Sequence, residues 1–237
     1  MPASGAAGIL SHNMRTKDFR WLFLAVVAAL LIIGNVRGPE TLGVFYGWTN
    51  GRYSFGGGTA PWALALSVVT IVLYLALMYS APGEEGQPLP GVFRRFVAFW
   101  LDFLLATMTV APMMGILPML TEWKRTGVFQ WDFERTTQFP GDGMVAAIVL
   151  PLFFAALVAY YVLPLMCGKP SPGSCILGYQ VLPEEGRTLR LWRAIGRTLV
   201  GFVALCLAWL APFLDRDRKH GQFWLDKAFR TRAIKLS

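Results

Sequence analysis

The chain has 237 residues, of which 55% are hydrophobic and only 15% are charged. Soluble domains carry about 25% charged residues, so the composition argues against a soluble domain and predicts an integral membrane protein. The net charge of +8 does not require a nucleic-acid partner, because basic loops of a membrane protein face the anionic cytoplasmic leaflet.

Five apolar windows are long enough, or nearly so, to span a membrane, for which roughly 20 residues are needed. They cover residues 21–36, 62–81, 96–120, 144–166 and 198–214. The first and last windows are short and need flanking residues to reach across. A cleaved signal peptide is disfavoured at the first window, because the chain continues as GNVRGPE without a small-residue cleavage site.

The connectors predict four segments along the chain. These are a loose cytoplasmic tail at 1–18, a transmembrane hairpin with a Gly- and aromatic-rich outer loop at 19–81, a Pro/Gly linker at 82–91, and a membrane domain at 92–237. In SCILGYQVLPEEGRTLRLW, residues 174–192, two short runs flank a PEEG turn. This pattern predicts a small cytoplasmic β-hairpin.

The distribution of charge orients the predicted helices. Bases precede the first window and dominate residues 167–197, whereas the loop at 121–143 is slightly acidic, so the amino terminus is expected in the cytoplasm. After four crossings, a fifth would put the basic tail at 215–237 outside, against the positive-inside rule. Two options stay open: the last window dips in and returns, which we favour, or it crosses and breaks the rule.

A charged pair stands at the start of the third window in RRFVAFWLD, residues 94–102. Arg95 and Asp102 share a helix face but are about 10 Å apart along the axis, too far for a direct pair. An aspartate at mid-span costs roughly 2.5–3.5 kcal/mol, so Asp102 needs a partner, for which Arg197 is the candidate. Asp102 is either a structural acid that locks helices together or an ion or proton ligand. Thr109 lies on the same face.

Two further expectations follow from single residues. Pro112, Gly115 and Pro118 predict a kink or break within the third window. His12 and His220 have no metal-ligand spacing, and the three cysteines form no CxxC pair. No metal, cofactor or disulfide framework is therefore expected, and no catalytic constellation indicates an enzyme.

The motifs from residue 95 onward resemble the RDD family of membrane proteins, which is named for one arginine and two aspartates. Four motifs carry the resemblance in the order of the family: RFVAFWLD at 95–102, KPSPGSCILGYQVL at 169–182, RAIGR at 193–197 and DKAFRT at 226–231. DKAFRT departs from the family at one residue, because Arg230 replaces the usual glycine before Thr231. The resemblance extends over about residues 92–235.

The windows and the resemblance together imply an all-α membrane protein. The expected architecture is a bundle of four to five transmembrane helices with a small cytoplasmic β-hairpin and a basic carboxy-terminal tail. The family implies a bacterial inner-membrane location. The expected partners are the lipid bilayer and anionic head groups at the basic loops. A second copy of the chain or another membrane protein is a further possible partner. Nucleic acid is not expected as a partner.

Two functions follow from the resemblance. In the first, the protein is a small transporter, specifically a monovalent cation/proton exchanger with Asp102 and Asp226 as ligands. In the second, it is a non-transporting scaffold or assembly factor, which the small number of windows and the lack of an inverted repeat favour. Either function uses one charge network: Arg95, Asp102, Arg197, Asp226 and Thr231, with Arg94, Thr109 and Arg193 as secondary members. Asp102 or Arg95 is expected within hydrogen-bonding reach of Arg197 or the Asp226 segment.

Overall fold

The structure is a computed structural model that describes residues 16–37, 43–49, 52–80, 85–88, 91–184, 188–206 and 224–236. Several predicted features lie outside these residues. They are most of the amino-terminal tail, most of the linker at 82–91, the second half of the fifth window, and both histidines.

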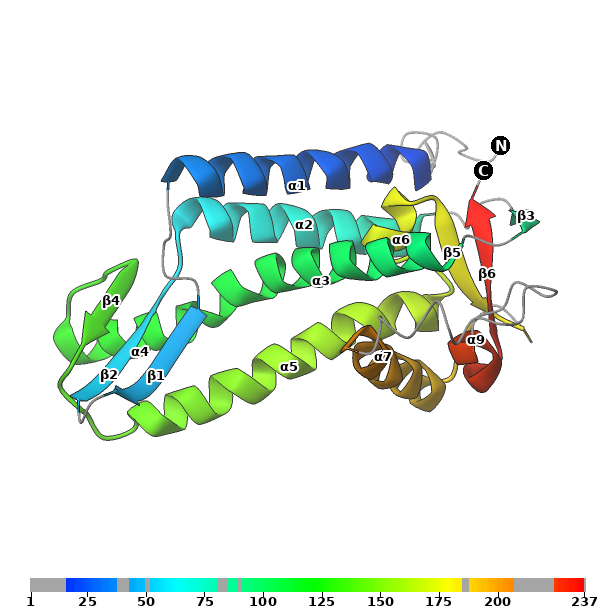
Figure 1. Ribbon diagram of the computed structural model, residues 1–237. Helices are drawn as coiled ribbons and strands as arrows, with labels where there is room; N and C mark the ends of the chain where they lie inside the picture. The colour runs from blue at the N-terminus through cyan, green and yellow to red at the C-terminus, as the bar shows by residue number, and fades with distance from the viewer. Residues whose placement is uncertain are drawn as a thin grey trace, which may run out of the picture. The chain divides into compact units, whose positions relative to one another are not determined.

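Four helices in the described part of the chain are long and apolar enough to cross a membrane. They are α1 (Thr16–Arg37), α2 (Pro61–Tyr79), α3 (Val92–Met114) continued by α4 (Ile116–Thr126), and α5 (Asp142–Cys167) (Figure 1). Their apolar side chains are exposed in many places, for example Val72 and Phe154, as expected of surfaces that face lipid. The predicted class, a mostly helical membrane protein with a small β-hairpin, is confirmed.

The third span is interrupted where proline and glycine predicted a break. Helix α3 ends at Met114, two residues after Pro112, and α4 begins at Ile116. A side chain on Gly115 would collide with the backbone carbonyl of Gly58 in strand β2 (Arg52–Gly58). Glycine therefore allows a strand to pass directly against the break in the helix.

The Gly- and aromatic-rich loop after α1, for which a short hairpin and an interfacial loop are the two expectations, forms a β-hairpin. Strand β1 (Gly43–Thr49) pairs antiparallel with β2, and β2 pairs antiparallel with β4 (Asp132–Arg135), so the sheet order is β1-β2-β4. Tyr53 and Phe55 of β2 form a small core with Val145 and Val149 of α5. Burial of these side chains fixes the sheet against the end of a membrane helix.

A second sheet joins three segments that are far apart in the sequence, in the order β3-β6-β5. Its strands are β3 (Glu85–Pro88), β6 (Thr231–Leu236) and β5 (Tyr179–Pro183). The partner of β5 differs from the expected one: it is β6, in a register that runs from Tyr179 opposite Lys235 to Pro183 opposite Thr231. The run expected to form the second strand is not a strand: residues 188–190 lie outside helices and strands, and Leu191 and Trp192 begin helix α7 (Leu191–Cys206). TRAIKL in β6 alternates buried and exposed positions over most of its length, as a half-buried strand does.

The chain divides into two compact units. The first comprises Met1–Leu24, Leu73–Phe99 and Pro164–Ser237, and it contains the β3-β6-β5 sheet with α6 (Pro172–Ile176), α7 and α9 (Trp224–Phe229). The second comprises Ala25–Val72 and Trp100–Leu163, with the β1-β2-β4 sheet and α4. The division of the sequence at residues 82–91 stays a prediction.

Pairing of β6 restricts the path of the last apolar window. Strand β3 lies in the connector between α2 and α3, and β5 lies in the connector after α5. In a chain that crosses the membrane four times, these two connectors are on one side. Because β6 pairs with both strands, the chain between β5 and β6 returns to the side that it left. The option in which the window at 198–214 dips in and returns agrees with this pairing and stays a prediction, because residues 207–214 lie outside the described part of the chain.

Cysteine labelling tests this topology. In a variant whose three native cysteines are serine, we expect Lys235→Cys and Thr188→Cys to react with a membrane-impermeant maleimide from the same side, and Glu134→Cys in β4 from the opposite side. All three positions are exposed, so access is decided by the membrane and not by burial. Labelling of Lys235→Cys from the side of Glu134→Cys would show a fifth crossing.

Candidate functional site

The carboxylate of Asp226, on α9, is fully buried and is bound by side chains from three other elements. Arg197 of α7 donates from Nη2 to Oδ1 over 2.8 Å, and Arg95 in the first turns of α3 donates from Nη1 to Oδ2. Thr231 of β6 donates to Oδ1 over 3.2 Å and accepts from Nε of Arg197 over 3.3 Å. Four of the five main residues of the expected network thus form one cluster, which we call the Asp226 cluster.

The chain around α9 is built to close this cluster. Helix α9 is short, and Arg230 directly after it adopts a left-handed conformation with φ of 51°. This turn sends the chain back into β6, so the hydroxyl of Thr231 reaches Asp226. Glycine enters this region of φ without strain, whereas arginine does so at a cost.

Close packing of α7 on α9 positions the second arginine. A side chain on Gly196 would lie 2.9 Å from the ring of Phe229, so the glycine lets the phenylalanine ring pack directly on the helix backbone. Arg197 is the next residue along α7, and its side chain reaches Asp226. The small residue in RAIGR and the aromatic residue in DKAFRT are therefore a packing pair.

The Asp226 cluster holds its carboxylate ionised. Burial by itself raises the pKa of Asp226, but the charges of Arg197 and Arg95 and their hydrogen bonds outweigh burial and lower the pKa below its usual range. Two guanidinium groups face one carboxylate, so the cluster carries excess positive charge. Nε and Nη2 of Arg95 are buried without a hydrogen-bond partner among the described residues.

Asp102 has a different environment. It lies on α3 inside a candidate span, is 3% exposed, and accepts a hydrogen bond of 3.2 Å from the hydroxyl of Tyr160 on α5. Thr109, expected on the same face, donates to the carbonyl of Leu105 in its own helix over 2.6 Å. Arg193 is an exposed residue of α7. The bond from Tyr160 was not foreseen from the sequence, because one aromatic among many apolar residues gives no signal.

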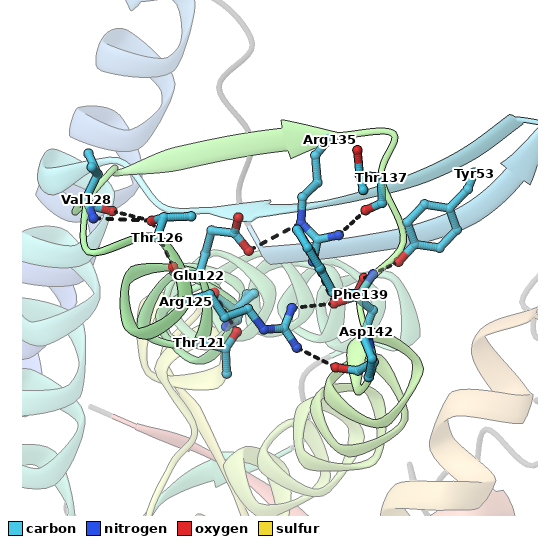
Figure 2. A network of polar contacts seen from close by, with 12 residues as sticks. Tyr53, Thr121, Glu122, Arg125, Thr126, Val128, Arg135, Thr137, Phe139 and Asp142 are labelled. Carbon is cyan, nitrogen blue, oxygen red and sulfur yellow. Dashed lines mark hydrogen bonds and ion pairs between the residues drawn. The ribbon is translucent and has the colours of Figure 1, made fainter.

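A second buried carboxylate, Asp142, was missed entirely from the sequence. Figure 2 shows Asp142, the first residue of α5, among donors from α4, β2, β4 and the loop before α5. Arg125 and Arg135 donate to Oδ1 over 2.7 and 2.6 Å, and the hydroxyl of Tyr53 and the amide of Phe139 donate to Oδ2 over 2.6 and 3.0 Å. We call this group the Asp142 cluster.

Neighbouring groups reinforce the Asp142 cluster. Arg135 also donates to Glu122 over 3.3 Å, and its guanidinium lies 4.4 Å from the centre of the Phe139 ring. Burial, together with the hydrogen bond to Asp142 and its charge, raises the pKa of Tyr53 to about 12. Tyr53 therefore stays protonated and keeps donating at physiological pH. The cluster ties the β1-β2-β4 sheet to α4 and α5.

Metal ligation finds no support in the described part of the chain. No group of three or more His, Cys, Asp or Glu side chains there could hold a metal ion. The acidic side chains of the two clusters are instead bound by arginines, a tyrosine and a threonine.

Four apolar helices, a carboxylate inside one span and a buried Arg–Asp–Thr cluster define an integral membrane protein with internal ion pairs. The sequence profile of the RDD family matches residues 89–229, more than half of the chain, and the chain belongs to this family. The match includes the arginine and both aspartates of the family name, Arg95, Asp102 and Asp226. Comparisons with curated proteins and with solved structures gave no match.

Proposed function

We propose that this RDD protein exchanges a monovalent cation for a proton across the membrane and that Asp102 is the group that binds both. One observation carries the proposal: the Asp102 carboxylate is 3% exposed inside a candidate span, and its partner Tyr160 lies on another span. An ionisable side chain within the membrane is expensive to keep and marks ion or proton pathways.

The chemistry of the pair suits this exchange. A carboxylate oxygen is a hard ligand that suits a proton or an alkali cation. Binding of the cation displaces the proton from Asp102, and release of the cation on the other side lets a proton return, so one charge crosses in each direction. The hydroxyl of Tyr160 is a neutral partner that can donate to the ionised carboxylate.

In this proposal Asp226 is a structural residue and does not carry protons. Its carboxylate is held by two arginines and a threonine, and its pKa is lowered. Protonation at neutral pH would leave both arginines without their partner, so Asp226 is a poor proton carrier. We assign the Asp226 cluster to anchoring the segments around α7 and α9.

A second candidate function is a membrane scaffold or assembly factor. The observation in its favour is the Asp226 cluster, in which Asp226 joins α3, α7, α9 and β6 in one buried network. A protein built to present a rigid surface to a partner needs such anchoring and needs no ion pathway. Under this function Asp102 and Tyr160 hold two helices together.

Transport by purified protein in proteoliposomes separates the two functions. We expect Na⁺ or K⁺ added outside to change the internal pH, read by a trapped dye, and Asp102→Asn to reduce this response to that of empty vesicles. Glu134→Gln removes an exposed carboxylate of β4 and should leave the rate unchanged. Asp102→Glu, which retains the carboxylate, serves as a second variant whose partial activity separates lost chemistry from lost folding. A folded wild-type protein without cation-driven proton movement would exclude exchange and leave the scaffold.

A further inference from the structure

Two arginines from different helices converge on one glycine in the first unit. A Cβ atom added to Gly178 would lie 3.6 Å from Nη2 of Arg94 and 3.9 Å from Nη1 of Arg20. Gly178 follows α6 and has a φ of +66°, and its carbonyl accepts from the amide of Leu236. The backbone is thus fixed by the β3-β6-β5 sheet, and two guanidinium groups lie over its bare Cα.

Among the described side chains, no acid forms an ion pair with either arginine of this convergence, Arg20 or Arg94. Nε of Arg20 is buried and has no hydrogen-bond partner in the described part of the chain. Like charges at short range repel, and a buried donor without an acceptor costs about 1–3 kcal/mol, so the site favours an anion that accepts from both arginines.

The position of the arginines along their helices indicates the source of the anion. Arg20 lies in the second turn of α1 and Arg94 in the first turn of α3, each directly before the apolar stretch of a candidate span. Side chains at this depth are level with lipid head groups. Basic pockets between membrane helices recognise anionic head groups, and guanidinium forks match phosphate oxygens in geometry.

We propose that Arg20, Arg94 and the backbone at Gly178 form a phosphate-binding site whose ligand is the head group of an anionic phospholipid. In this site Arg20 and Arg94 donate to the phosphate oxygens, and the absence of a side chain at Gly178 keeps the backbone between them uncovered. The lipid then bridges α1, α3 and the loop that leads into β5. The site is independent of the Asp102 chemistry.

Thermal unfolding in a neutral detergent tests the site. We expect dioctanoyl phosphatidylglycerol to raise the unfolding temperature of the wild-type protein, and dioctanoyl phosphatidylcholine at the same concentration to leave it unchanged. Arg20→Gln combined with Arg94→Gln should weaken the apparent affinity for phosphatidylglycerol about tenfold or more. Arg190→Gln, an exposed arginine before α7, is the matched control and should retain the wild-type response. Loss of the response in Arg190→Gln as well would reveal general attraction between charges and overturn the site.

A charge supplied at the glycine provides an independent test. Gly178→Asp puts a carboxylate between the arginines, and Asp tolerates left-handed backbone better than most residues. We expect this variant to lose the response to phosphatidylglycerol while remaining folded, and Gly178→Asn to retain it in part. An equal rise with inorganic phosphate alone would overturn the lipid as ligand and identify free phosphate. An equal rise with phosphatidylcholine would overturn the anion site itself.

Discussion

Replacing Asp226 by asparagine is expected to lower the free energy of unfolding by about 3–5 kcal/mol, because the change leaves two buried arginines without their counter-charge. The side chains of Arg95 and Arg197 are only 13% and 16% exposed, so water cannot replace the carboxylate fully. Thermal unfolding in detergent should show a fall on the order of 10 °C. Asp132→Asn, at an exposed aspartate of β4, is the control and should change little.

The pH dependence of this loss identifies its cause. Because the pKa of Asp226 is lowered in the folded protein, the unfolded chain takes up the proton first, near pH 3.9, and the folded protein does so only at lower pH. The stabilisation is therefore complete at neutral pH and is lost as the pH falls through the folded pKa. The stability difference between wild-type protein and Asp226→Asn should shrink on acidification. A difference that does not vary with pH would assign the loss to packing and not to charge.

A double-mutant cycle locates the partner. Arg197→Gln should also destabilise the protein, since it removes the 2.8 Å bond to Asp226. When the two changes are combined, the total loss should be smaller than the sum of the single losses, because the second change removes a group whose partner is already gone. Additive losses would contradict a direct Arg197–Asp226 interaction.

Replacing Asp142 by asparagine is the second change for which we expect a large effect, a loss of about 3 kcal/mol. Asp142 is 1% exposed and accepts four hydrogen bonds, two of them from arginines. The loss should be smaller than at Asp226, because the side chain of Arg125 is 28% exposed and water can solvate it. The same thermal unfolding measurement reports the effect.

Glu122 provides the matched contrast for Asp142. Its carboxylate makes one described bond, of 3.3 Å to Arg135, and glutamine keeps an oxygen that can accept this bond, so Glu122→Gln should cost about 1 kcal/mol. Tyr53 gives a second measurement: without the charge of Asp142, its pKa should fall below about 12, while burial keeps the pKa above its usual value; absorbance of the phenolate detects the change. Equal losses for Asp142→Asn and Glu122→Gln would mean that the four bonds do not act as a unit.

The sequence predicted those features that depend on local pattern. Length and hydropathy located the four spans, and Pro112 with Gly115 located the break between α3 and α4. The cost of a charge near the membrane required partners for Arg95 and Asp102, and the order of the family motifs brought Arg197 and Asp226 into consideration. The structure joins Arg95, Arg197 and Asp226 directly.

Features that depend on pairing across the chain were beyond the sequence. Tyr53 binds Asp142 across 89 positions, and neither residue stands in a pattern that distinguishes it from other loop residues. The partner of β5 was assigned to the nearest following run, because short strands carry no information on which strand they pair with. Tyr160 beside Asp102 is a third example, since apolar spans contain many aromatic residues that face only lipid.

The order of strands in the β3-β6-β5 sheet has a consequence for biogenesis. Its central strand, β6, is synthesised after both of its neighbours, so β3 and β5 have no partner in this sheet while the ribosome is still making the helices. Asp226 emerges only shortly before β6, so Arg95 and Arg197 also wait for their counter-charge until that time. A nascent chain interrupted before residue 226 presents two unpaired strands and two uncompensated arginines, features that quality-control proteases can distinguish from the finished fold.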